Sequence, residues 1–226
     1  MTVAIKVHNA IERSSWIRRM FEEGAALIAE FGAENVYDFT LGNPSVEPPE
    51  AFRRELRRIV DQPDLGMHRY MNNAGYEETR AAVAKNIAKY SGVPINSSHI
   101  IMTCGAGGAL NVTLKTILNP GEEVIILTPF FVEYKFYVDN HGGTTTEVWT
   151  DPETFQPNIE AIESAITDNT RAIIINSPNN PTGAVYSAET LQALGKMLER
   201  KQAELDRNIY VISDEPLSLI HISEPT

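Results

Sequence analysis

Short β-branched runs alternate with longer amphipathic stretches along most of this chain. The apolar positions recur at helical spacing in five segments, near 76–90, 107–118, 132–141, 159–166 and 188–203. Runs rich in Val, Ile and Thr predict strands at 99–103, 123–127, 144–149, 171–175 and 208–212. Strands that alternate with helices form a largely parallel sheet with helices on both faces. The pattern therefore predicts an α/β fold.

The first sixty residues show a different pattern. Apolar positions between 9 and 31 predict an amphipathic helix, and a short strand is expected at 36–39. A proline pair then precedes a helix that carries four arginines, Arg53, Arg54, Arg57 and Arg58. Clustered arginines can bind an anion, but we interpret them as a solvated helix face paired with neighbouring acids. We assign them no chemistry.

Composition and charge narrow the class of protein. With 42% hydrophobic and 22% charged residues, the chain can bury a core. A formal net charge of −11 argues against binding to nucleic acid or to anionic membranes, because phosphate attracts the opposite charge. Cys104 is the single cysteine, which excludes an internal disulfide. Residues 1–10 lack the apolar core of a signal peptide and no apolar run approaches membrane-spanning length, so we expect a cytoplasmic protein.

Two short sequence motifs contain residues that could bind a ligand or take part in catalysis. One is the amide-rich turn 177–183, which reads SPNNPTG and follows the predicted strand at 171–175. The other contains Asp214 and follows the predicted strand at 208–212. Open α/β sheets bind ligands at the carboxyl ends of their strands. The histidines His68, His99 and His141 show no metal-ligand spacing, so we expect no metal.

Together with a glycine-rich loop at 104–110 and the segment around Tyr70, these strings resemble the class I/II, fold-type I aminotransferases that use pyridoxal 5′-phosphate (PLP) and include aspartate aminotransferases. The resemblance covers roughly residues 16–216. It implies an N-terminal segment with part of a small domain in 1–48, and a truncated PLP-binding large domain in 49–216. The family sheet has seven strands, in the implied order first, seventh, sixth, fourth, fifth, second, third. This chain supplies the first five.

The resemblance also implies which residues hold the cofactor ring. Asp214 matches the aspartate that pairs with the ring nitrogen, where an anion favours the charged pyridinium; an aspartate that caps a loop is the alternative. Asn180 matches the asparagine that donates to the phenolic oxygen of the cofactor and lies beside the substrate. Asn179 is its competitor. Phe131 matches the aromatic residue that stacks on the ring, with Phe130, or simple core packing, as alternatives.

Further residues match the contacts of the phosphate and the substrate. Gly105, Ala106 and Gly107 open a predicted helix, where free N–H groups meet an anion, although glycines here also suit a tight turn. Tyr70 matches the tyrosine that reaches the phosphate of the neighbouring subunit, which implies a homodimer. Gly42 resembles the main-chain contact to the substrate carboxylate, with a plain turn as the alternative.

The Schiff-base lysine of the family lies well beyond the aspartate, and no lysine follows Lys201 in this chain. Residues 217–226 resemble the translation of a sequencing adapter, so we expect authentic sequence to stop at Pro216; a divergent natural C-terminus is the alternative. On this interpretation the chain is an inactive N-terminal fragment. The parent protein would move an amino group between an amino acid and a 2-oxo acid. A PLP-dependent C–S lyase or decarboxylase, and a non-catalytic binding protein, stay open as alternatives.

Overall fold

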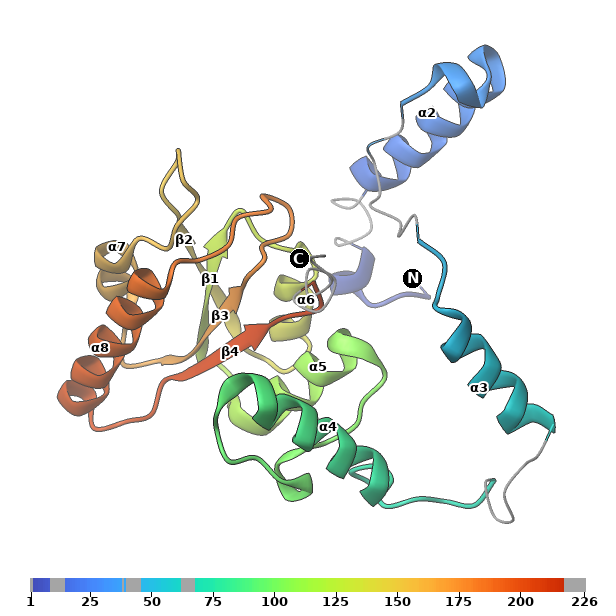
Figure 1. The fold of residues 1–226 in the computed structure, drawn as a ribbon. Helices are drawn as coiled ribbons and strands as arrows, with labels where there is room; N and C mark the ends of the chain where they lie inside the picture. The colour runs from blue at the N-terminus through green and yellow to red at the C-terminus, as the bar shows by residue number, and fades with distance from the viewer. Residues whose placement is uncertain (1, 9–14, 38, 40–45, 62–67, 218–226) are drawn as a thin grey trace. The chain divides into compact units, whose positions relative to one another are not determined.

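A computed structural model describes residues 2–8, 15–37, 39, 46–61 and 68–217 (Figure 1). Its contacts divide the chain into two units, residues 1–69 and 70–226, and each unit is treated by itself below. No helix among these described residues is long and apolar enough to cross a membrane.

The first unit is helical. It contains α2 (Ser15–Phe31), the 3₁₀ turn η1 (Ala33–Asn35) and α3 (Glu50–Asp61), so the two helices expected here are confirmed. On α3, Arg57 pairs with Glu50 and Arg58 pairs with Glu55, all well exposed, as expected for a solvated helix face. The strand expected at 36–39 is wrong over residues 36, 37 and 39, since no strand among the described residues of this unit lies beside it.

The second unit alternates helices and strands. The helices are α4 (Glu77–Ser91), the 3₁₀ turn η2 (Ser97–His99), α5 (Gly105–Ile117), α6 (Tyr134–Asp139), α7 (Ile159–Ala165) and α8 (Ala188–Leu205). The strands are β1 (Glu123–Thr128), β2 (Thr144–Trp149), β3 (Thr170–Asn176) and β4 (Tyr210–Asp214). All strand pairs are parallel, so the predicted α/β class is confirmed.

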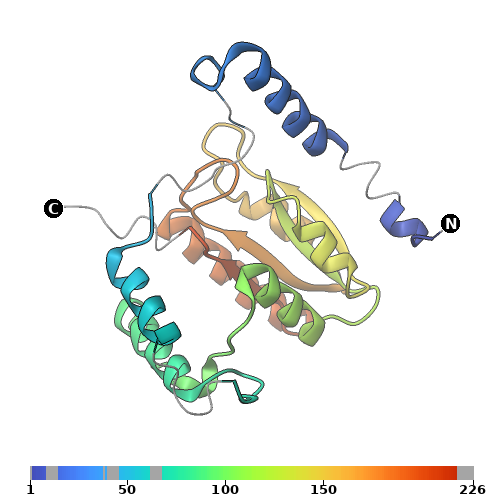
Figure 2. The same cartoon turned by 90° about the vertical axis from the view of Figure 1, so that its right-hand side faces the viewer.

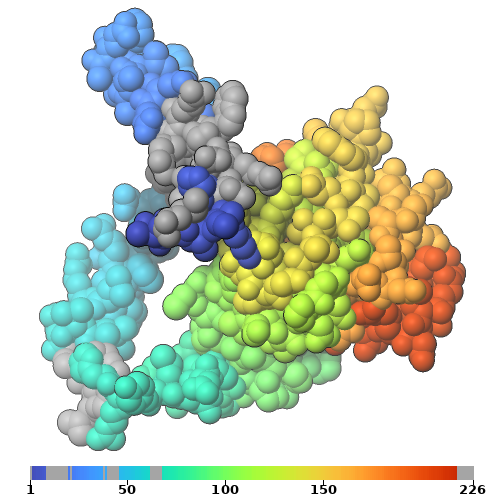
Figure 3. Space-filling model, turned by 180° about the vertical axis from the view of Figure 1, so that it is seen from behind, coloured from blue at the N-terminus to red at the C-terminus, as the bar shows by residue number. Residues whose placement is uncertain are grey.

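Helices cover both faces of the sheet, which lies between two helical layers (Figure 2). Alternate residues of a strand point to opposite faces. Ile125 and Ile173 accordingly pack in one core with residues of α7 and α8, whereas Val124 and Ile174 pack in the other with residues of α5 and α6. In the view from behind, the part of the chain from α5 to α8 forms one continuous packed body (Figure 3).

The strand order is β2-β1-β3-β4, which corrects the order implied above. We expected the fifth predicted strand, now β4, to lie between the second and the fourth. Instead β3 lies beside β1, and β4 is at the edge. The burial of the two strands explains this order: β3 is buried over almost its whole length, whereas β4 is exposed at Tyr210 and Val211. Parallel strands at the centre of a sheet are covered on both faces.

The strand expected at 99–103 is also wrong, so the sheet has four of the five strands we expected. Residues 100–103 follow η2 without pairing to any described strand. The Met102 N–H instead donates to the carbonyl of Ala74, at 2.9 Å. A β-branched sequence forms a strand only where a neighbour completes the ladder, and none of the described residues provides one here.

Candidate functional site

Asp214 ends β4 at the carboxyl edge of the sheet, with only 9% of its surface exposed. The hydroxyl of Tyr134, itself 2% exposed, donates to Oδ2 of Asp214 at 2.5 Å. Burial and the adjacent carboxylate raise the pKa of Tyr134, so its phenol stays a protonated donor. Among the described residues, the other oxygen of Asp214 accepts no hydrogen bond. The carboxylate is therefore held on one side and available to a ligand on the other.

Asn176 connects Asp214 to the turn 177–183. It is the last residue of β3, lies in register with Asp214 and is 5% exposed. Its Nδ2 donates to the main-chain carbonyl of Asp214 at 2.8 Å, and its Oδ1 accepts from the N–H of Asn180 at 2.7 Å. Our sequence reasoning missed this residue. The available signal was a polar side chain at the end of an apolar strand, next to the turn.

The two asparagines of the turn have different surroundings. Asn179 is buried, and its Oδ1 accepts from the N–H and the hydroxyl of Thr182, at 3.1 and 2.8 Å. Its main-chain carbonyl accepts from the N–H of Gly183, where φ is +73°. Asn180 is exposed, and its side chain makes no hydrogen bond to the described residues. Asn179 therefore holds the turn together, which leaves Asn180 as the amide that can contact a ligand.

Phe131 lies next to this group. Its ring meets the ring of Tyr134 edge to face, with centroids 5.7 Å apart and an interplanar angle of 81°. Phe130 packs against the same core, and the ammonium of Lys135 lies 5.3 Å from the centre of its ring. Phe131 is thus the aromatic residue in contact with the hydrogen-bond partner of Asp214.

The start of α5 has main-chain donors at Ala106 and Gly107. Cys104 precedes the helix and makes no capping hydrogen bond through its side chain, so these N–H groups lack that partner. The N–H of Gly105 instead donates to the carbonyl of Thr103, at 3.0 Å. A side chain built on Gly105, where φ is +70°, would meet no atom within 4 Å. One built on Gly107 would come within 2.9 Å of the Tyr137 hydroxyl on α6. Together with Ala106, these glycines form an open cradle beside the helix that also carries Tyr134.

The structure thus connects Asp214, Asn180 and Phe131 through Asn176 and Tyr134, and α6 links them to the start of α5. Tyr70 is fully exposed and makes no contact with this group. Its predicted role in a neighbouring subunit is untested by a single chain. Gly42 lies outside the described residues, as do residues 218–226 of the expected tail.

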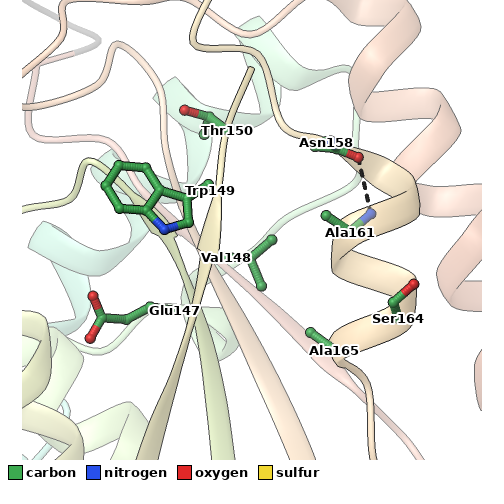
Figure 4. Close-up of a pocket in the computed structure, with 8 residues that line it drawn as sticks. All are labelled: Glu147, Val148, Trp149, Thr150, Asn158, Ala161, Ser164 and Ala165. Atoms are coloured by element: carbon green, nitrogen blue, oxygen red, sulfur yellow. Dashed lines mark hydrogen bonds between the residues drawn. The ribbon is translucent and has the colours of Figure 1, made fainter. Parts of the chain in front are cut away.

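A hollow of about 480 Å³ lies elsewhere in the second unit, between β2 and α7 (Figure 4). Its lining includes Glu147, Trp149, Asn158 and Ser164, and none of the predicted site residues. Asn158 there caps the start of α7 by accepting from the N–H of Ala161, at 3.0 Å. Because the convergent polar groups lie at the carboxyl ends of β3 and β4, we assign the hollow no part in the site.

Comparisons with known proteins identify the family of this chain. The family model for aminotransferase class I and II matches residues 34–215. An aspartate/prephenate aminotransferase of Thermus thermophilus is 38% identical over 177 residues, which cover 78% of this chain and 44% of the relative. An aspartate aminotransferase of Thermotoga maritima is 35% identical over 195 residues, 85% of this chain and 49% of the relative.

Solved structures of aminotransferases also superimpose on this chain. The crystal structure of an amino transferase from Eubacterium rectale superimposes with a TM-score of 0.93 and 37% identity, over 100% of this chain and 57% of that one. Thermus thermophilus aspartate aminotransferase with maleate gives a TM-score of 0.75 and 36% identity, over 88% and 50%. The chain spans about half the length of the curated relatives it matches.

Proposed function

The chain belongs to the class I and II aminotransferase family, and we propose that its parent protein moves an amino group from an amino acid to a 2-oxo acid with PLP. The fold is an incomplete fold-type I α/β domain. We assign residues 49–216 to the cofactor-binding domain and residues 1–48 to the N-terminal segment and part of a small domain. The names of the relatives support transamination over the lyase and decarboxylase alternatives.

One observation carries this proposal. A buried carboxylate, Asp214, is fixed by a neutral donor, and the same hydrogen-bond network holds the turn that presents Asn180. When bound, PLP supplies an electron sink for the charge that develops on the substrate α-carbon. An anion beside the ring nitrogen keeps that nitrogen protonated. Asp214 has the burial, and a carboxylate oxygen available, that this role requires.

The other groups fit the remaining parts of the cofactor. The side-chain amide of Asn180 would donate to the phenolic oxygen, and the ring of Phe131 would cover one face of the pyridine. The helix start at Gly105, Ala106 and Gly107 would hold the phosphate, chiefly through the N–H groups of Ala106 and Gly107, because a helix start attracts anions. The open space at Gly105 supports this placement, since a side chain there would fill the cradle.

This chain has no lysine after Lys201, and we propose that it holds the cofactor without catalysing turnover. We also propose that the full-length protein is a cytoplasmic homodimer. In that dimer, Tyr70 would donate to the phosphate bound by the partner, and Gly42 would contact the substrate carboxylate. The full exposure of Tyr70 in the single chain supports this role.

Binding of pyridoxine 5′-phosphate tests the proposal on the chain itself. This analogue has no aldehyde, so it cannot form an imine with surface lysines. We expect Asp214→Ala to weaken its binding by about 10–100-fold, because a hydrogen bond to a charged group contributes about 1.5–3 kcal/mol. Asp168→Ala, at an exposed position, is the control and should bind like the wild type. Equal affinity of the two variants in equilibrium dialysis would contradict the proposal.

A further inference from the structure

The amide of Asn176 joins the two groups that would contact opposite edges of the cofactor ring. We propose that Asn176 is a positioning residue that fixes the separation between Asn180 and Asp214. This inference rests on the proposed function, because the separation matters for the ring that those two residues would hold. Asn176 itself would not touch the ring.

The geometry of the bridge supports this role. Both hydrogen bonds of Asn176, at 2.8 and 2.7 Å, fall in the ordinary range for N–H donors and oxygen acceptors. One ends on the main chain of Asp214 in β4, and the other on the main chain of Asn180 in the turn. Because the side chain is buried, water is a poor substitute for either partner. A single amide plane therefore bridges the two main chains at the end of the β3–β4 ladder.

The sequence around the bridge explains why an amide is needed. The ladder ends at this pair, because Asn176 is the last residue of β3 and Asp214 the last of β4, and no main-chain N–H among the described residues beyond the strands donates to the carbonyl of Asp214. The carbonyl of Asp214 therefore receives its hydrogen bond from a side chain. Asparagine has both the donor for this carbonyl and the acceptor for the N–H of Asn180. Aspartate retains only the acceptor, and alanine retains neither.

No other hydrogen bond among the described residues joins the turn 177–183 to β4. Asn179 bonds mainly within the turn, and its Nδ2 reaches the carbonyl of Pro129 only at 3.5 Å. Among the described residues, the side chain of Asn176 is therefore the hydrogen-bonded connection between this turn and β4.

Two substitutions separate the halves of the bridge. Asn176→Ala removes both hydrogen bonds, and Asn176→Asp keeps the acceptor for Asn180 but removes the donor to Asp214. Asn158→Ala is the matched control, because it removes the hydrogen bond of a different asparagine at the start of α7. In NMR-detected amide exchange, we expect Asn176→Ala to expose the N–H of Asn180, and Asn176→Asp to keep it protected. The amides of β1 should stay protected in all three variants.

Affinity for pyridoxine 5′-phosphate is the second measurement. We expect both Asn176 variants to bind about 10-fold more weakly or worse, the usual effect of losing a residue that orients a ligand-binding group, and Asn158→Ala to bind like the wild type. Unchanged exchange at Asn180 in Asn176→Ala would overturn the inference. So would normal affinity in both Asn176 variants while the wild type binds. Failure of the wild type to bind would instead contradict the proposed function.

Discussion

Removing the hydroxyl of Tyr134 should destabilise the second unit far more than its size suggests. Tyr134→Phe deletes one oxygen, but that oxygen supplies the hydrogen bond to Oδ2 of Asp214, at 2.5 Å, from a side chain only 2% exposed. Hydrogen bonds to charged groups contribute about 1.5–3 kcal/mol. We expect the free energy of unfolding to fall by about this amount, because a buried carboxylate is left short of a donor.

Urea unfolding at low protein concentration, followed by circular dichroism, measures this change. With a slope of about 2 kcal/mol per molar urea, the midpoint should fall by roughly 1 M. Tyr137→Phe is the matched control, since it removes a half-buried phenol oxygen from the same helix without breaking a hydrogen bond to Asp214. Its free energy of unfolding should stay within about 0.5 kcal/mol of the wild type.

A double-mutant cycle identifies the cause. In the background of Asp214→Asn, the cost of Tyr134→Phe should fall to about 0.5–1.5 kcal/mol, the value for a neutral pair. If Tyr134→Phe resembles Tyr137→Phe, or if its cost is the same with aspartate and asparagine at 214, the charge-assisted bond does not hold Asp214 as we describe.

Three further predictions concern the glycine cradle, the buried phenols and the sheet edge. Gly107→Ala should weaken binding of pyridoxine 5′-phosphate, because its methyl group would lie within 2.9 Å of the Tyr137 hydroxyl. Combining Gly107→Ala with Tyr137→Phe should restore affinity in equilibrium dialysis. If affinity is not restored, this contact is not the cause of the weaker binding. Burial raises the pKa of Tyr134, Tyr137 and Tyr186 above 10.0. Below pH 10 these phenols are protonated in both the folded and the unfolded chain, whereas above it they ionise first in the unfolded chain. The free energy of unfolding measured in urea should therefore fall by up to ~1.4 kcal/mol per pH unit for each tyrosine. A free energy of unfolding that does not change from pH 9 to 11 would contradict the burial of these phenols. Val211 is 46% exposed on the edge strand β4, and edge strands can pair with other chains. Val211→Lys should therefore reduce self-association in sedimentation velocity, with Val112→Lys, at an equally exposed position on α5, as the control. Equal sedimentation of the two variants would show that β4 is not the surface through which chains associate.

The sequence predicted most of the second unit, because its elements follow local patterns. The strand at 144–149 has the predicted bounds, and β1, β3 and β4 lie within two residues of theirs. The incorrect predictions concern features that depend on which other elements pack or pair beside a segment. Residues 99–103 have strand-like composition but no described strand to pair with, and the position of β4 at the edge depends on which strand the helices cover. Periodicity reports which face of an element is apolar, and says little about what lies beside it.

The same distinction separates the parts of the site that sequence could predict. Asp214 and Asn180 stand in recognisable strings, and the structure brings their segments together. Tyr134 lies 80 residues before Asp214 in the chain, so no local sequence pattern predicts their hydrogen bond. Asn176 is close in sequence to Asn180, yet its second bond, to Asp214, forms only when β3 and β4 pair. Sequence motifs predicted the groups that would touch the cofactor, and tertiary structure was needed to find those that hold them in place.

The most direct test of the account is a crystal structure of this chain grown with pyridoxine 5′-phosphate. We predict the ring nitrogen within hydrogen-bond distance of the Asp214 carboxylate, the phenolic oxygen at the Asn180 amide and the phosphate at the start of α5, beside residues 105–107. Clear density for the ligand at any other place, with Asp214 and Asn180 left without contact to it, would contradict the central claim.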